Sequence, residues 1–254
     1  MKIVLTFDIE RDVPNVLNTY FGVKVGLLKI LKLLDNFNVN ATFFCTGHVA
    51  QHLPEYIRLI ERKGHEIACH GLSHERLNQL GFIKCQEAIS QNKEILENTC
   101  QNSEIIGFRS PYLNPPNYLF KVLNNLGFKY DSSIKSHKKV KSYQKYNYGI
   151  QEFPPSNFNI FFRIPMNFYL LLKWIFKKKL IILCFHATEV INMKDIIRNQ
   201  MRAFKLFLNL SYRPDRWLNT GDIFNTKIHN FIKECLSKKA EFLTLKQLYL
   251  QESR

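Results

Sequence analysis

Reactive side chains follow four separate apolar, strand-like stretches of this sequence. The first stretch is followed by the acids Asp8 and Glu10, and the second by the histidines His70 and His74. Arg109 follows the third stretch and His186 the fourth. One polar residue after a strand carries little weight. Four such positions in one chain indicate a common site, because the carboxyl ends of parallel strands meet at one face. The sequence therefore predicts one pocket with acid–base and metal-binding groups.

The two histidines stand four residues apart, as His70-Gly-Leu-Ser-His74. This spacing can set two imidazoles on one face of a helical turn. Catalytic zinc sites commonly combine two histidines with one carboxylate and keep a position open for water. Two surface histidines in a loop are the alternative, but the acidic cluster after another strand favours the metal. Nitrogen and oxygen ligands suit Zn²⁺ best here, and they also admit Co²⁺, Ni²⁺ or Mn²⁺.

The acids at Asp8 and Glu10 are two residues apart on an extended segment, so they face the same side. Two carboxylates in one pocket raise one pKa unless a cation separates them. A metal held by one acid, with the other beside it as a base, resolves this repulsion. Asp12 is either a third member of the cluster or a helix or turn cap before Pro14.

Arg109 begins the segment Arg109-Ser-Pro-Tyr112. A guanidinium can hold a carboxylate through two parallel hydrogen bonds, so Arg109 could orient Asp8 and keep it ionised. A surface arginine in a turn is the alternative interpretation. His186 ends the apolar stretch Leu180–Phe185, where a satisfied core histidine is as common as a catalytic one.

Strand-like and helix-like stretches alternate along the chain and must position these groups. The strand patterns cover 2–7, 41–46, 66–69, 105–108, 128–131, 180–185 and 242–243, and the helical patterns cover 23–37, 53–63, 80–96, 118–126, 195–208 and 224–236. Such alternation is typical of parallel βαβ units. The hydrophobic content of 46% excludes a disordered or collagen-like chain.

The net charge of +15 is unevenly distributed. Residues 1–110 hold 12 basic and 12 acidic residues, so the whole excess follows residue 110. It favours an anionic partner, such as a phosphate-bearing substrate or an acidic lipid headgroup, and no nucleic-acid motif accompanies it. Residues 136–148 suggest a basic surface loop. Residues 164–179 read either as an interfacial membrane contact or, as we favour, as a core helix; no run reaches the length of a membrane span.

The first residues and the cysteines bear on cellular location. Met1-Lys2 leads directly into a strand pattern, without the features of a signal peptide. The six cysteines show no Cys-x-x-Cys spacing, and we expect buried, reduced thiols. We therefore expect a cytoplasmic protein, with association at the cytoplasmic membrane face as an alternative.

These motifs, in this order, resemble those of the polysaccharide deacetylase family, also called the NodB-homology domain or carbohydrate esterase family 4. The matching segments are Thr6-Phe-Asp-Ile-Glu10, Ala41-Thr-Phe-Phe44, His70-Gly-Leu-Ser-His74, Arg109-Ser-Pro-Tyr112 and Leu183-Cys-Phe-His186. The resemblance runs from residue 2 to about residue 190. It implies an α/β fold, an irregular (β/α) barrel of about seven parallel strands, and we expect residues 1–254 to form a single domain.

The resemblance also implies roles for individual residues. Asp8 would be the general base, Arg109 would position it, the Tyr112 backbone N–H would support the oxyanion, and His186 would be the general acid. The metal ligands would be Glu10, His70 and His74. Most members have a second aspartate where this chain has Ile9, and Glu10 fits a branch with an Asp-x-Glu motif. The third ligand therefore stays open between Glu10 and Asp12, and Asp131 is a candidate support for His186.

The implied activity is metal-dependent removal of an N-acetyl or N-formyl group from an amino sugar. The candidate substrates are a glycan and a lipid-linked or nucleotide-linked sugar. The charge distribution favours the last two, because they carry phosphate. Two alternatives remain: a metal-free amidohydrolase of the same fold that acts on a cyclic ureide, and a non-catalytic basic binding protein. The sequence does not define the oligomeric state.

Overall fold

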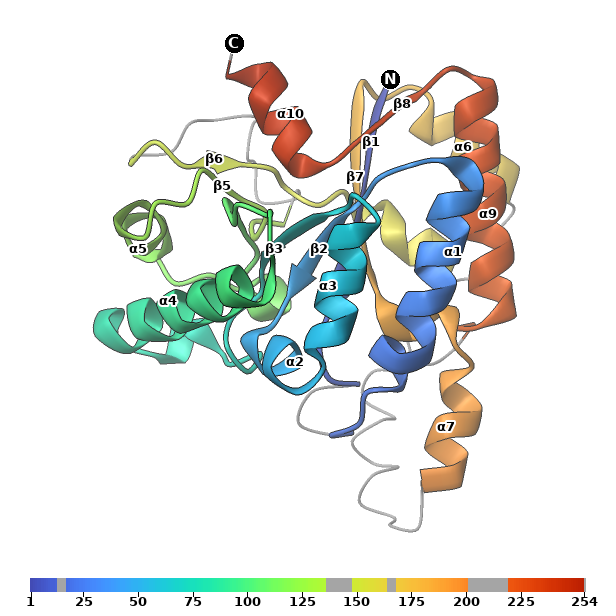
Figure 1. Cartoon of the computed structure of the whole chain (residues 1–254). Coiled ribbons are helices and arrows are strands. Elements are labelled where there is room, and N and C mark those ends of the chain that lie inside the picture. The colour runs from blue at the N-terminus through green and yellow to red at the C-terminus, as the bar shows by residue number, and fades with distance from the viewer. Residues whose placement is uncertain (13–16, 136–147, 164–167, 201–218, 254) are drawn as a thin grey trace.

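A curved sheet of parallel strands forms the centre of the computed structural model (Figure 1), which describes residues 1–12, 17–135, 148–163, 168–200 and 219–253. The strand order is β6-β5-β4-β3-β2-β1-β7, and β8 pairs with the start of β1. The strands are β1 (Lys2–Ile9), β2 (Thr42–Cys45), β3 (Glu66–Cys69), β4 (Gly107–Phe108), β5 (Tyr130–Asp131), β6 (Gln151–Glu152), β7 (Leu180–His186) and β8 (Glu241–Leu243). The pairings among them are parallel, so their carboxyl ends meet at one face.

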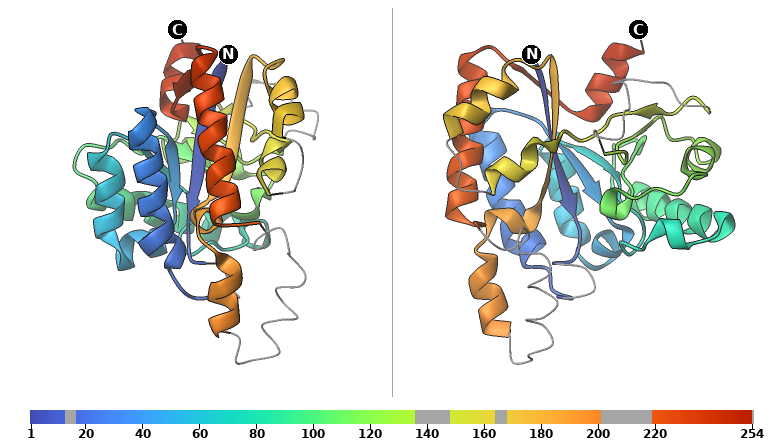
Figure 2. Two further views of the ribbon diagram at one scale, coloured as in Figure 1. Left: turned by 90° about the vertical axis from the view of Figure 1, so that its right-hand side faces the viewer. Right: turned by 180° about the vertical axis from the view of Figure 1, so that it is seen from behind.

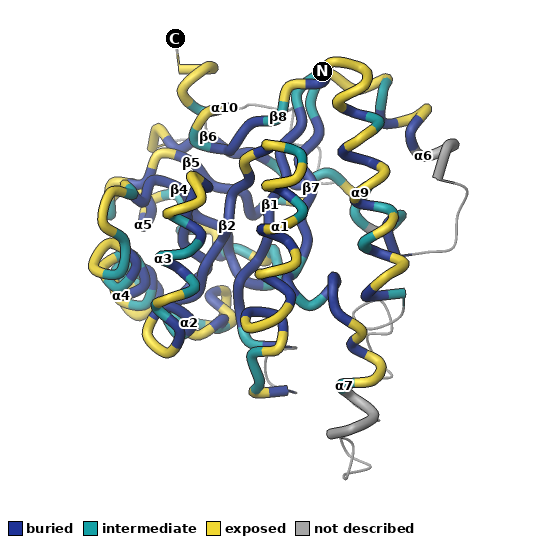
Figure 3. Tube along the Cα trace, turned by 45° about the vertical axis from the view of Figure 1, so that its right-hand side comes forward, coloured by how far each residue is buried: buried dark blue, intermediate teal, exposed yellow. Residues whose placement is uncertain are grey.

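Helices cover the outside of this sheet. Figure 2 shows α1 and α3 on one side of β1 and β7, with α6 on the other side. The longer helices are α1 (Leu27–Phe37), α3 (Pro54–Arg62), α4 (Phe82–Thr99), α6 (Phe168–Ile175), α7 (Met193–Gln200), α9 (Asp222–Ser237) and α10 (Leu245–Glu252). The shorter ones are η1 (Gly22–Gly26), α2 (Gly47–His52), η2 (Leu77–Gln79), η3 (Pro111–Leu113), α5 (Leu119–Asn125), η4 (Asn157–Phe162) and η5 (Ala187–Val190). The burial pattern follows this arrangement, with buried strands inside and exposed outer helix faces (Figure 3).

The alternation of side chains along β1 separates two apolar clusters. Ile3, Leu5, Phe7 and Ile9 point outward into the large cluster beneath the helices. Val4 belongs to a smaller inner cluster. Because successive side chains of a strand face opposite sides, Thr6 and Asp8 lie on the same inner face as Val4. The inner face of β1 thus changes from apolar to charged toward the carboxyl end.

The opposite end of the sheet is closed by α10. Leu245 and Leu248 join the inner apolar cluster. The backbone N–H of Leu245 donates to Thr42 Oγ1 at 2.9 Å, and that of Lys246 donates to Glu66 Oε2, also at 2.9 Å. The first turn of α10 therefore satisfies buried polar atoms of β2 and β3, which would otherwise cost stability.

The predicted α/β barrel of about seven parallel strands is confirmed, with the short β8 in addition. The sequence patterns missed β6, α2 and α10, which are only 2, 6 and 8 residues long. The helix expected over 195–208 begins at Met193 and is described only to Gln200. Most of the expected basic loop over 136–148, and residues 164–167 of the apolar segment, lie outside the described residues.

The apolar segment before β7 forms α6, which packs against the body of the protein. Leu172 and Ile175 are buried, whereas Lys173 and Trp174 are exposed. Within the described part of the chain, no helix has the length and apolar character needed to cross a membrane. All six cysteines are free thiols, and all but Cys100 are buried.

Candidate active site

Two carboxylates, Asp8 and Glu10, stand close together at the end of β1. Asp8 lies on the inner face of the strand, and Glu10 follows it two residues later; both are more than nine-tenths buried. Ile9 between them is fully buried in the outer cluster. In this chain position 9 thus belongs to the apolar core, and the second acid stands one residue further on, facing the two histidines.

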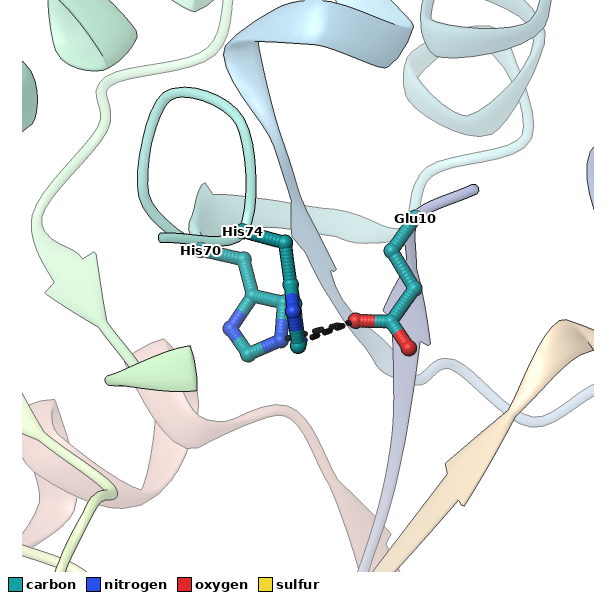
Figure 4. A group of neighbouring side chains, drawn as sticks. All are labelled: Glu10, His70 and His74. Atoms are coloured by element: carbon teal, nitrogen blue, oxygen red, sulfur yellow. Dashed lines mark ion pairs between the residues drawn. The ribbon is translucent and has the colours of Figure 1, made fainter. Parts of the chain in front are cut away.

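Glu10, His70 and His74 form a compact group of potential metal ligands (Figure 4). One ligand atom from each lies within 4.8 Å of the other two. Glu10 Oε2 is 2.6 Å from His74 Nε2 and 3.4 Å from His70 Nε2. No described group makes a hydrogen bond of good geometry to that buried oxygen. Three buried ligand atoms that converge in this way, with an unsatisfied carboxylate oxygen, fit a divalent cation.

A bent loop, and not the expected helical turn, brings the two histidines together. Gly71 and His74 both have positive φ angles, 76° and 63°. The Glu75 carboxylate accepts hydrogen bonds from the backbone N–H groups of Leu72 and Ser73, which fixes the bend. The imidazole centroids of His70 and His74 are 5.2 Å apart. The prediction that His70 and His74 lie together is confirmed, but the predicted helical turn is wrong.

The expected third-ligand alternative, Asp12, has a different position. Its two carboxylate oxygens accept hydrogen bonds from the Thr19 hydroxyl and from the backbone N–H groups of Phe21 and Gly22. Asp12 therefore caps the start of the η1–α1 helix, where unpaired N–H groups favour an acid. Glu10, and not Asp12, faces the two imidazoles.

Arg109 is fully buried at the centre of the barrel and uses all its donor nitrogens. Its Nη1 donates to Asp8 Oδ1 and Thr6 Oγ1, both at 2.8 Å, and contacts Cys184 Sγ at 3.3 Å. Its Nε and Nη2 donate to the backbone oxygen and the hydroxyl of Ser132. These hydrogen bonds orient the guanidinium toward Asp8.

The ionisation of Asp8 follows from these neighbours. Burial raises the pKa of Asp8, but the charges of Arg109, His70 and His186 outweigh it, and the pKa lies below its usual value. Asp8 Oδ2 lies 3.8 Å from His70 Nε2 and 3.7 Å from His186 Nε2. Asp8 is therefore an ionised carboxylate between one potential metal ligand and the late histidine.

His186 ends β7 and points its Nε2 toward the two acids. Its Nδ1 lies 3.0 Å from Glu189 Oε1, and the same oxygen accepts a hydrogen bond from the His186 backbone N–H. Glu189 is buried and also pairs with the Arg163 guanidinium. Burial raises the pKa of Glu189, but the charge of Arg163 and the bond to His186 lower it below its usual value.

The expectation that Asp131 supports His186 is corrected by this geometry. Asp131 accepts hydrogen bonds from the hydroxyl and the backbone N–H of Ser133, at 2.6 and 3.2 Å. Ser133 Oγ in turn accepts from the backbone N–H of Ser110, at 2.7 Å. Asp131 thus supports the Arg109–Tyr112 turn. Sequence reasoning missed Glu189, although its place three residues after His186 at the end of a strand was a usable signal.

Tyr112 stands in a strained part of this turn, with a φ of 63°. Non-glycine residues in this conformation often lie at functional sites. The ring of Tyr112 packs edge-on against His74, at 4.5 Å between centroids. Tyr112, His74 and Asp8 line one cavity of about 670 Å³, together with His186 and His70. The sequence-predicted groups other than Asp12 and Asp131 therefore meet in or directly beneath one cavity.

The protein is a parallel α/β barrel. The carboxyl face of its sheet holds a buried Asp8–Arg109 pair and a Glu-His-His group that could bind a metal ion. Residues 1–130, about half of the chain, match the family described as polysaccharide deacetylase, and the chain belongs to that family.

One curated relative and two solved structures are similar to this chain over the following shares of their length. A peptidoglycan deacetylase from Helicobacter pylori is 28% identical over 114 residues, which cover 45% of this chain and only 39% of that protein. A structure from Pseudomonas aeruginosa, assigned to the polysaccharide deacetylases, is 15% identical with a TM-score of 0.71 and covers 98% of this chain and 89% of its own. An allantoinase structure is 16% identical with a TM-score of 0.60, over 90% and 89% of the two chains. At these identities the structures show a shared fold.

Proposed function

We propose that this protein is a metal-dependent hydrolase that removes the N-acetyl or N-formyl group from an amino sugar. The observation that carries the proposal is the convergence of an ionised Asp8 with the Glu10–His70–His74 group and His186 at one cavity. Family membership and the similarity to a peptidoglycan deacetylase support the same reaction class. The substrates that we consider are a glycan and a lipid-linked or nucleotide-linked sugar.

Glu10, His70 and His74 would hold the metal. When bound, a divalent metal supplies a Lewis acid and lowers the pKa of coordinated water toward neutrality. The carboxylate of Asp8, kept ionised by Arg109, is the group that accepts a proton from the attacking water. Zn²⁺ is the expected ion, and Co²⁺, Ni²⁺ or Mn²⁺ would satisfy the same ligands.

The remaining residues act on the substrate. His186 gives a proton to the leaving amine through Nε2, while Glu189 holds Nδ1 and fixes the ring. The backbone N–H of Tyr112 supports the charge that develops on the carbonyl oxygen, in the manner of an oxyanion hole. The products are a carboxylic acid, acetate or formate, and a free amino sugar.

The first test is metal content after zinc loading and exhaustive dialysis. The wild-type protein should retain about one equivalent, and the His70→Ala/His74→Ala variant should lose it. The chain offers a matched control, because His48 and His52 are also four residues apart and stack at 4.1 Å between centroids, but lie outside the Glu10 group. His48→Ala/His52→Ala should retain the metal.

Acetate release from N-acetylglucosamine oligomers by the zinc-loaded protein then tests the reaction. A wild-type protein without stoichiometric metal would contradict the proposal and favour the metal-free amidohydrolase. A metal-free protein that retains DNA with a steep salt dependence would favour the binding protein instead.

A further inference from the structure

Three cationic side chains line the candidate active-site cavity; Arg163 pairs with the buried Glu189, and the other two have no part in the proposed chemistry. These two are Arg76, which follows the histidine loop, and Lys135, which follows β5. Both are exposed, and neither forms an ion pair with another residue of the described segments. Among the described residues that line the cavity, Asp8 is the only acid, and its carboxylate is already paired with Arg109. The mouth of the cavity is therefore electropositive.

Arg76 is held in place by the residues that build the site. Its guanidinium carbon lies 4.3 Å from the centroid of the Tyr112 ring. The same ring also contacts His74, so Arg76 and a potential metal ligand share one aromatic neighbour. A guanidinium that stacks through its face keeps its N–H edges available for a carboxylate or phosphate. Arg76 is thus a preformed anion-binding group beside the reacting centre.

Lys135 comes from a different segment of the chain and adds a second positive charge. It stands two residues after Ser133, which anchors the Arg109–Tyr112 turn. The side chains of Asn114 and Asn159 also line the cavity, and their amide groups can donate hydrogen bonds. Two cations with neutral amide donors suit the oxygens of a phosphate or a carboxylate. A neutral sugar chain would leave both charges without an anionic partner.

We propose that the cavity selects an amino sugar that carries an anionic group, a phosphate or a carboxylate, and that Arg76 and Lys135 bind this group. The inference rests on the proposed function, since it names the substrate class of the same site. Side chains that bear a permanent charge and line a concave site raise both the local concentration and the affinity of an anionic ligand.

Calorimetric titration of the zinc-loaded protein tests the inference with three sugars. N-acetylglucosamine is neutral, N-acetylglucosamine 1-phosphate carries a phosphate, and N-acetylmuramic acid carries a carboxylate. We expect at least one anionic sugar to bind about tenfold more tightly than the neutral sugar at low salt, with a smaller advantage at higher ionic strength. The anionic sugar with the larger advantage identifies the preferred anion.

Variants separate the two named residues from the general positive charge of the protein and from the metal. Arg76→Met/Lys135→Met keeps the apolar stems and removes both charges, so the affinity advantage should disappear. Arg62→Met/Lys84→Met removes one arginine and one lysine from exposed positions on α3 and α4, and the advantage should remain. The inference is overturned if the wild type binds all three sugars equally, or if the advantage survives in Arg76→Met/Lys135→Met.

Acyl release is measured separately on the wild-type protein with the same sugars and with neutral chitotetraose. Absence of release from every sugar would contradict the proposed function, whereas the affinity ratio alone decides the anion-binding inference. The two failures are therefore distinguishable.

Discussion

Nδ1 of His70 lies 2.9 Å from the backbone oxygen of Arg109, the residue whose guanidinium holds Asp8. A carbonyl oxygen can only accept, so Nδ1 carries the proton, and in the neutral imidazole Nε2 presents its lone pair toward Glu10. Such a bond to the second nitrogen is the usual way in which a metal-binding histidine is oriented. Arg109, directly after β4, thus orients both the potential metal ligand His70 and the proposed base Asp8.

The tautomer of His70 is a first prediction. In the metal-free protein, neutral His70 should carry its proton on Nδ1 because of the Arg109 carbonyl. Long-range ¹H–¹⁵N correlation spectra of the imidazoles distinguish the two tautomers. His65, whose two ring nitrogens have no hydrogen-bond partner among the described residues, serves as an internal comparison. A proton on Nε2 of His70 in the majority species would contradict the proposed ligand geometry.

Asp8→Asn should reduce turnover strongly without loss of the metal. Removal of a general base typically costs about 10²- to 10⁴-fold in kcat, and none of Glu10, His70 and His74 is changed. Acetate release and zinc content are measured on the same preparation. Full activity in Asp8→Asn would show that the base is a different group.

Glu189→Gln should lower kcat at least tenfold with little change in KM, because His186 would lose the carboxylate that orients it. The same change leaves Arg163 without its buried carboxylate partner, which should cost about 3 kcal/mol of stability.

The double variant Arg163→Gln/Glu189→Gln separates these two effects. Removing both charges should restore much of the stability and none of the kcat. Thermal unfolding and steady-state kinetics provide the two measurements. If kcat recovers together with stability, Glu189 has a structural role only.

The buried pair of Glu152 and Asp131 predicts a pH dependence of stability. Burial and then the nearby Asp131 charge raise the pKa of Glu152 well above its usual value, against the smaller opposing effect of Arg109. A carboxyl group with a raised folded-state pKa contributes stability below its unfolded pKa, and this contribution is lost as the pH rises through the folded pKa.

Glu152→Gln should therefore flatten the pH profile, because glutamine mimics the protonated acid. Relative to the wild type it should gain about 1 kcal/mol or more between pH 5 and pH 8. Urea unfolding at several pH values measures the effect. Glu94→Gln, at an exposed position on α4, is the control and should leave the slope unchanged. An equal shift at all pH values would contradict the prediction.

Gly107→Ala should destabilise the barrel by about 3 kcal/mol. A Cβ at this position would stand 2.0 Å from the Tyr130 ring, which is fully buried and hydrogen-bonded to Glu66 at 2.6 Å. Gly81→Ala, where a Cβ meets nothing within 4 Å, should change stability by less than about 1 kcal/mol. Similar losses for both variants would show that the Tyr130 contact is not responsible.

Sequence patterns identified the strands and most of the site because both depend on local order. Asp8, His70, Arg109 and His186 each come at or just after an apolar strand, so parallel topology alone brings them together. The roles of Asp12, Asp131 and Glu189 could not be assigned in this way. Each role depends on the conformation of a loop. Hydrogen bonds such as those of Glu75 set that conformation, and the pattern of apolar residues does not predict them.

The pairing of β1 with β7 sets Asp8 directly opposite His186 in register, although these residues are 178 positions apart in the chain. The proposed base and acid are thus neighbours in space, although most of the chain lies between them in sequence. Contacts of such long range slow folding, because loop-closure entropy is lost before the contacts form. During synthesis, the first strand must wait for most of the chain before its partner β7 exists. A growing or shortened chain without β7 therefore lacks the proposed acid, and catalytic competence would itself report that β7 has paired with β1.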